Sequence, residues 1–231
     1  MTIKKDIIIS EIVEQFEQLS EIILSQLDLL NNIIESHTDD IPNKLIEQII
    51  VNEQLVDNFE IEMDAQIIKT IVLHKPVASE LRQLFAIYRM VISLERIGDR
   101  VVKIMYYIIN IKDKQILKKM SLMLQPMLNI SIQMVRNALI SYTNKDKDYA
   151  LWTMKKDNTL DELIKKLVNK SINNSEFPKD FQVLLVSFSD IMGIISSIER
   201  IGDQATNIAE TAIYAILGKD IRHHNIDTKD I

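Results

Sequence analysis

Several residue types are scarce in this chain of 231 residues, and each scarcity narrows the possible structures. The chain has no cysteine, which excludes disulfide bridges and thiolate metal sites and is typical of a reducing compartment. Glycine and proline occur only four times each, so few positions favour a turn or break a helix. No stretch approaches the roughly 18 uncharged apolar residues that would span a membrane.

Charge and composition exclude further classes of protein. The net charge of −6 disfavours binding to a phosphate backbone, so no nucleic-acid partner is expected. Near the N-terminus, Glu11 and Glu14 interrupt the apolar run that a signal peptide would need. Because 47% of the residues are apolar and 26% are charged, the composition is that of a globular protein. We therefore expect a cytoplasmic protein that does not insert into a membrane.

Apolar residues recur at alternating spacings of three and four, which predicts long amphipathic helices. The first segment shows the clearest stripe: Ile9, Ile12, Phe16, Leu19, Ile23, Leu27, Leu30 and Ile34. This first helix should end at the turn-forming stretch "SHTDDIPN", and Pro76 is expected in the first turn of the third helix. Pro126 should kink or break the fourth helix, and Gly218 should cap the sixth. The later helices are expected at about 43–73, 76–110, 115–143, 146–173 and 179–217.

A pentapeptide occurs twice, in "SLERIGDRV" at 93–101 and in "SIERIGDQA" at 197–205. The two copies are offset by 199 − 95 = 104 residues. The same offset carries the pair Glu53 and Asp57 onto Asp157 and Asp161. Two features in one register predict an internal duplication. We therefore expect an all-α fold of two tandem homologous three-helix bundles, a spectrin-repeat-like arrangement, with boundaries at 1–112 and 113–231.

The repeated acids stand four residues apart, which brings like charges together on a helix at a cost of a few tenths of a kcal/mol per pair. Glu95 and Asp99 are expected along one edge of the apolar face of their helix. Arg96, Arg100 and Lys103 are expected on the far side. One interpretation is that each acid pair is a helix-edge feature that nearby Lys or Arg side chains neutralise.

A second interpretation applies if the second and third helices of each half are neighbours. Four carboxylates would then converge, and they could not all stay ionised beside an apolar seam without a cation. Oxygen ligands suit hard ions such as Mg²⁺, Ca²⁺, Mn²⁺ or ferric iron, among which the sequence does not select. The candidate metal ligands are Glu53, Asp57, Glu95 and Asp99 in the first half and Asp157, Asp161, Glu199 and Asp203 in the second.

Two enzyme classes that use carboxylates fit the sequence less well. A ferritin-like di-iron enzyme needs a Glu-x-x-His pair on two helices. The four histidines, however, stand outside every acid pair: His37, His74, His223 and His224. A glycosidase needs two acids with different environments, whereas two acids four apart on one helix are similarly placed.

These motifs resemble the PhoU family, whose members are cytoplasmic regulators associated with the phosphate-specific ABC transporter of bacteria. The resemblance covers nearly the whole chain and includes "KPVASELRQLFAIYRMVISLERIGD" at 75–99, which is similar to the family's approach to the first motif. The second approach, "PKDFQVLLVSFSDIMGII", lacks the Leu-Arg pair, and Gly193 stands where Arg89 stands in the first.

The resemblance implies a role and a set of partners. In some family members, acid-x-x-x-Asp motifs hold iron or zinc clusters, which implies that the eight carboxylates named above bind a metal ion or small metal cluster. It further implies a non-enzymatic negative regulator of phosphate uptake and of the phosphate-starvation response. Its partners would be the ATPase of a phosphate ABC transporter and a sensor histidine kinase, and we expect a homodimer located at the inner membrane only through these partners. The alternative is a metal-dependent hydrolase or metal-storage protein that uses the same carboxylates.

Overall fold

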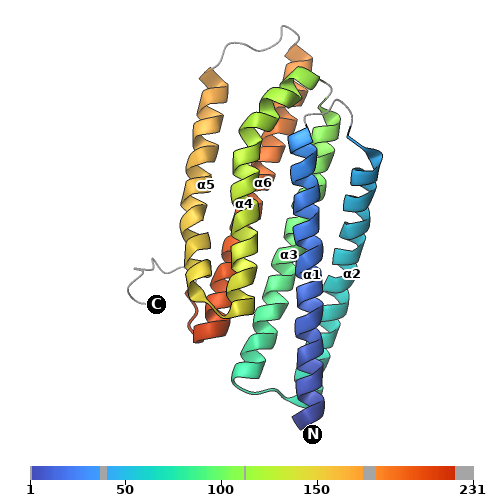
Figure 1. Ribbon diagram of the computed structural model, residues 1–231, viewed down its shortest axis with the longest axis vertical. Helices are drawn as coiled ribbons and strands as arrows, with labels where there is room; N and C mark the ends of the chain where they lie inside the picture. Colours follow the sequence, from blue (N-terminus) through green and yellow to red (C-terminus); the bar gives the residue numbers. More distant parts are fainter. Residues whose placement is uncertain (1, 37–40, 112, 174–180, 222–231) are drawn as a thin grey trace.

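The computed structural model describes residues 2–36, 41–111, 113–173 and 181–221. Within these residues the regular elements are six α-helices, as the sequence predicts (Figure 1). His37, His223 and His224 lie outside the described residues. The helices are α1 (Thr2–Ser36), α2 (Asn43–His74), α3 (Ser79–Asn110), α4 (Lys114–Asn144), α5 (Lys147–Asn173) and α6 (Phe181–Leu217).

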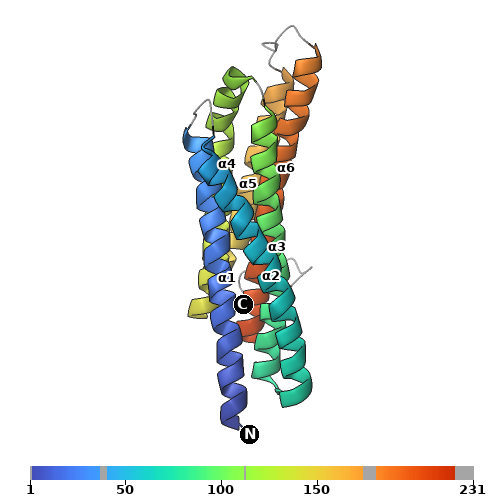
Figure 2. The ribbon, with the colours of Figure 1, turned by 90° about the vertical axis from the view of Figure 1, so that its right-hand side faces the viewer.

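The six helices form two three-helix bundles that lie side by side (Figures 1 and 2). Helices α1, α2 and α3 pack against one another and form the first unit, while α4, α5 and α6 form the second. The most extensive contact between any two helices joins the units, through α3 and α6, and α1 adds a contact with α4. The expected fold class is therefore confirmed. Among the described residues, no helix is both long and apolar enough to cross a membrane.

The predicted stripe on α1 forms the core of the first unit. All eight of its residues are buried, and none of their side chains is more than 8% exposed. On α3 the buried face runs from Leu84 to Ile108 and continues between the units. Each large apolar side chain buried in this way contributes about 1.5–3 kcal/mol relative to an exposed one, so the long stripes hold the bundle together.

The start of α3 differs from the prediction by three residues. Pro76 was expected in its first turn, but the helix begins at Ser79. Lys75 and Ala78 on either side of Pro76 both have a φ of 47°, in the left-handed region. A helix cannot pass through such residues, so the chain turns between α2 and α3 before α3 starts.

Two other helix ends follow ordinary capping chemistry. Asp113 caps α4, because its Oδ1 accepts hydrogen bonds from the backbone N–H groups of Gln115 and Ile116 at 2.9 and 3.1 Å. Gly218 ends α6 as expected: its φ is +71°, and its N–H donates to the Tyr214 carbonyl at 2.9 Å. Pro126 lies within α4, which continues across it, so the possible break does not occur.

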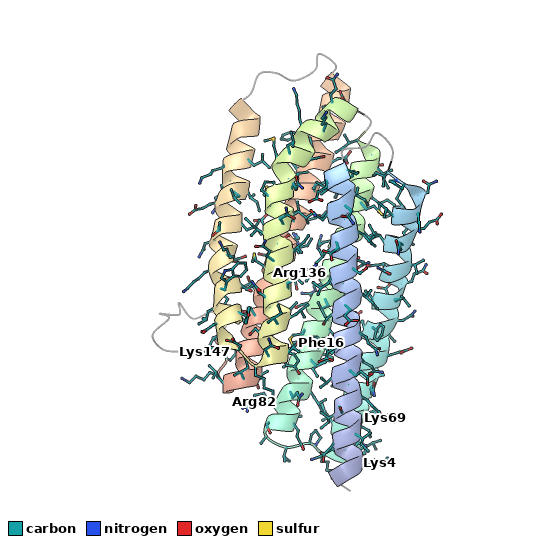
Figure 3. The ribbon with its side chains drawn as sticks, in the orientation of Figure 1. Lys4, Phe16, Lys69, Arg82, Arg136 and Lys147 are labelled. Atoms are coloured by element: carbon teal, nitrogen blue, oxygen red, sulfur yellow. The ribbon has the colours of Figure 1, made fainter. Side chains whose placement is uncertain are left out.

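Polar and aromatic contacts also join the units. Arg136 lies on α4 (Figure 3). Its guanidinium donates to both carboxylate oxygens of Asp28 on α1 at 2.7 Å. Nearby, the ring of Phe16 on α1 meets the ring of Tyr142 on α4 edge to face, with 5.3 Å between centroids. The Arg82 guanidinium of α3 lies against Gly218 at the end of α6. The units are therefore in contact at several levels along the bundle.

Candidate functional site

The predicted acids of the first unit lie together on the neighbouring helices α2 and α3. Glu53 is half-buried, and burial is the main reason why its pKa rises from 4.5 to about 7. Repulsion from Asp57, Asp99 and Glu95 raises the pKa of Glu53 further, so all four carboxylates share one electrostatic neighbourhood. Burial also raises the pKa of Glu95, with contributions from Glu60, Asp99 and Asp57 in that order. The expected convergence of helices two and three is thus present.

Gly98 and Gln26 position the Glu53 carboxylate. A Cβ on Gly98 would lie 2.7 Å from Oε2 of Glu53, so the carboxylate occupies space that only a glycine leaves open. Gln26, buried on α1, donates from Nε2 to the same Oε2 at 3.0 Å and to the Ile49 carbonyl at 3.3 Å. The glycine inside the repeated pentapeptide therefore allows the two helices to bring their acids together.

The second unit repeats the arrangement with α5 and α6. Burial raises the pKa of Asp157 from 3.8 to about 6, and repulsion from Asp203, Asp161 and Glu199 adds to the shift. Burial likewise raises the pKa of Glu199 and of Asp203. Here the equivalent glycine, Gly202, makes room mainly for a Leu160 methyl group at 2.5 Å from its would-be Cβ. The two carboxylate groups are alike in charge but are packed by different neighbours.

Lysines one turn along the same helix neutralise one acid in each group. Lys103 pairs with Asp99 at 2.9 Å, and Lys165 stands 3.9 Å from Asp161. The expectation that Lys103 projects to the far side is therefore wrong, because residues four apart share one face of a helix. Both lysines are at least 44% exposed, and ion pairs in such positions stabilise a protein little. The helix-edge interpretation accounts for these two acids but not for Glu53 and Asp157.

The donor chemistry of both groups fits a hard cation, because every ligand would be a carboxylate oxygen. In the part of the chain that the structure describes, however, no three His, Cys, Asp or Glu side chains are arranged to hold a metal ion. The carboxylates are close enough to repel one another and would need new rotamers to share an ion. Metal binding by the eight residues stays a prediction.

Three residues near the first group were not predicted from the sequence. Glu60 has a pKa raised by burial and by Asp57 and Asp64, so the row of acids on α2 extends two turns beyond Asp57. The spacing 53, 57, 60 and 64 is that of one helix face and could have revealed both acids. Gln26 also had a signal, since it is a polar residue on the apolar stripe between Ile23 and Leu27.

Comparisons with known proteins agree with this architecture. The model of the PhoU domain matches the chain twice, over residues 16–108 and 124–212. The phosphate-specific transport system accessory protein PhoU homolog of Pseudomonas aeruginosa is 29% identical over 229 residues, covering 96% of this chain and 93% of the relative. The protein of the same name from Clostridium acetobutylicum is 30% identical over 181 residues, covering 77% of this chain and 80% of the relative.

Solved structures show the same fold. The crystal structure of PhoU from Pseudomonas aeruginosa superposes with a TM-score of 0.77 at 22% identity, covering 93% of this chain and 99% of the other. The crystal structure of the phosphate transport system regulatory protein PhoU from Streptococcus pneumoniae superposes with a TM-score of 0.74 at 19% identity, covering 94% of this chain and 98% of the other. Both support the tandem three-helix architecture, while the boundaries at 1–112 and 113–231 stay a prediction.

Proposed function

The chain belongs to the PhoU family, and from this membership we propose that it is a cytoplasmic negative regulator of phosphate uptake and of the phosphate-starvation response. The observation that carries the proposal is the double match of the PhoU domain, one copy in each three-helix unit. The relatives compared above bear the name of accessory proteins of the phosphate-specific transport system.

The regulator would act as a non-enzymatic adaptor between the ATPase of a phosphate ABC transporter and a sensor histidine kinase. Its sequence contains no P-loop motif, which is consistent with an adaptor that leaves ATP hydrolysis to its partner. Its net charge of −6 favours docking to a basic face of a partner. A homodimer that reaches the inner membrane through these partners completes the proposal.

The eight predicted carboxylates would hold a metal ion or small metal cluster in each unit, with iron or zinc suggested by the family. Glu53, Asp57, Glu95 and Asp99 would serve the first unit, and Asp157, Asp161, Glu199 and Asp203 the second. A bound cation would supply positive charge that neutralises the carboxylates and links the two helices that carry them. Without it, Glu53 holds a proton on its carboxyl group at a pH just below 7, because its pKa is about 7.

The test is alkaline phosphatase activity in phosphate-rich medium, in cells that lack this gene and carry a complementing copy. We expect derepression in the deletion strain and repression with the wild-type chain. A variant that combines Glu95→Ala, Asp99→Ala, Glu199→Ala and Asp203→Ala should fail to repress while accumulating normally. A matched variant that loses four exposed acids elsewhere should repress: Glu11→Ala, Glu14→Ala, Glu62→Ala and Glu162→Ala. If the deletion leaves alkaline phosphatase repressed, the regulatory role is wrong for this chain.

A metal-dependent hydrolase or a metal store is the second candidate. One observation favours the hydrolase: Glu53 and Asp157 have pKa values of about 7 and about 6, near those useful for a general acid or base. Metal analysis and phosphatase assays on purified protein separate the candidates. Bound metal together with turnover that the same quadruple variant abolishes would replace the adaptor proposal with an enzyme. Bound metal without turnover would agree with either the adaptor or the store, which the repression assay then distinguishes.

A further inference from the structure

The first unit carries a second notable surface on α2 and α3, beyond its four predicted metal ligands. A pocket of about 230 Å³ opens between the two helices. Its rim includes Glu60, Ile61 and Asp64 of α2 and Tyr88 and Ile92 of α3. We refer to this pocket, with the apolar residues that continue it along α2, as the α2–α3 groove. Figure 2 views the molecule from the side on which α2 lies in front.

Exposed apolar side chains extend the groove along α2. Ile61, Ile68 and Val72 are 68%, 53% and 64% exposed. At about 100° per residue they fall within about 40° of one another, so they form one stripe roughly 16 Å long. On α3, Phe85 is 48% exposed one turn before Tyr88. Single exposed apolar residues are ordinary, but a continuous stripe beside a pocket is typical of a binding surface.

The charges at the groove are mainly negative. Oδ1 of Asp64 is buried and has no hydrogen-bond partner among the described residues. Burial and the charges of Asp57 and Asp64 raise the pKa of Glu60, and only the Arg96 guanidinium opposes them. A buried carboxylate oxygen without a donor is costly, and an N–H group from outside the chain would satisfy it. The groove therefore combines apolar walls with acceptors for a cationic donor.

The second unit lacks this combination of residues, so the three-helix fold does not require it. At the offset of 104, Glu60 corresponds to Ile164 and Ile61 corresponds to Lys165. Ile164 is buried and the Lys165 side chain is 74% exposed, so apolar and charged positions are exchanged. Ile92 corresponds to Ser196, which is exposed. Since the second unit folds in the same way with these positions exchanged, their arrangement in the first unit points to a partner.

We propose that the α2–α3 groove binds an amphipathic helix of a partner protein that presents apolar side chains flanked by Lys or Arg. The apolar face of the helix would cover Ile61, Ile68 and Val72, and a Lys or Arg side chain would enter the pocket and donate to Asp64. A second copy of this chain is a poorer occupant, because a two-fold contact would bring the same carboxylates together. Anionic lipid is also a poorer occupant, because its negative charge would meet the groove carboxylates.

The test uses purified full-length protein and two synthetic helical peptides of 16 residues. Both carry Leu and Ile on one face, flanked by Lys in the first and by Glu in the second. We expect the Lys peptide alone to bind in fluorescence anisotropy and to shift the NMR signals of residues 61–72 and 85–92. Ile61→Lys combined with Ile92→Ser should weaken its binding at least about tenfold, since loss of apolar contact of this size costs more than about 1.4 kcal/mol. Both substitutions copy the second unit, so the fold should tolerate them.

A matched control keeps the result specific. Val51 is 53% exposed on α2 but does not line the pocket and lies nearly three turns before Ile61, and Val51→Lys copies Lys155 of the second unit. We expect this variant to bind the Lys peptide like wild type, and Glu60→Gln with Asp64→Asn to remove the preference for Lys over Glu.

Three results would overturn the proposal. The first is equal binding of both peptides. The second is that Val51→Lys weakens binding of the Lys peptide as much as the groove substitutions do. The third is that Ile61→Lys abolishes self-association or binding to phosphatidylcholine vesicles but leaves peptide binding unchanged. Because the readout is binding in vitro, it is independent of the repression assay for the proposed function.

Discussion

At the scale of single residues, Glu53 is the group whose charge should govern the pH dependence of stability. Its pKa is about 7 in the folded chain and 4.5 in the absence of the fold, so between these values the folded state holds a proton that the unfolded state releases. The contribution of Glu53 to the free energy of unfolding should therefore be fully present below pH 4.5 and fall as the pH rises to 7. In chelator-treated protein, Glu53→Gln should raise the free energy of unfolding at pH 8, on the order of 1 kcal/mol for this half-exposed site, and leave it unchanged at pH 4.5.

Urea unfolding at several pH values measures this effect. Asp157→Asn serves as the comparison, because the pKa of Asp157 rises only from 3.8 to about 6 and its window lies at lower pH. A Glu53→Gln variant less stable than wild type at pH 8 would mean that the ionised carboxylate is favourable where it lies.

Gly98 offers a second prediction at the residue scale. Alanine suits a helix interior better than glycine by about 1 kcal/mol, yet its Cβ would lie 2.7 Å from Oε2 of Glu53. Because that oxygen ends a flexible side chain, Gly98→Ala should leave stability within about 1 kcal/mol of wild type and displace the carboxylate toward water. The pKa of Glu53, measured by NMR titration, should then fall toward 4.5.

Gly202→Ala is the control for Gly98→Ala. Its Cβ would meet a Leu160 methyl group at 2.5 Å and the Asp157 carboxylate only at 3.7 Å, so it should disturb packing and leave the pKa of Asp157 at about 6. An unchanged pKa of Glu53 in Gly98→Ala would show that the glycine does not position the acid.

At the scale of elements, the contact between α3 and α6 depends on Gly193. A Cβ there would lie 2.5–2.9 Å from three ring carbons of Tyr107, and a packed ring cannot move aside as a side-chain tip can. Gly193→Ala should therefore lower the free energy of unfolding by about 1–3 kcal/mol. In a Tyr107→Ala background the same change should cost less than about 0.5 kcal/mol, which a double-mutant cycle by urea unfolding measures. Equal costs in both backgrounds would exclude the ring as the cause.

The elements themselves were largely predictable, since apolar spacing of three and four identifies a long helix without tertiary information. The start of α3 was not, because nothing in the residue types of Lys75 and Ala78 signals a left-handed backbone. The absence of an Arg at position 193 was visible as a departure from the first unit. Its reason, the ring of Tyr107, became clear only from the packing of α3 against α6.

At the scale of the whole molecule, the duplication made the shared carboxylate groups predictable but gave no signal for the acids that occur in one unit alone. The offset of 104 residues pointed to both carboxylate groups, because they occur in both units. The same offset could not reveal Glu60 and Asp64, whose counterparts are Ile164 and Val168. Features that both units share thus follow from the repeat, whereas features of one unit must be found from the spacing within that unit or from the structure.

The joined units should unfold as one cooperative body, because α3 and α6 bury their most extensive contact against each other. Trp152, the only tryptophan, lies on α5 and reports on the second unit, while circular dichroism reports on both. Ile12→Ala removes a fully buried side chain from the first unit and should cost about 2–5 kcal/mol. If the units are coupled, this variant lowers the urea midpoint of Trp152 fluorescence as much as that of circular dichroism. A fluorescence midpoint that stays at the wild-type value while circular dichroism splits into two transitions would show that the units fold independently, and α3 with α6 would then be a docking contact between two separate bundles.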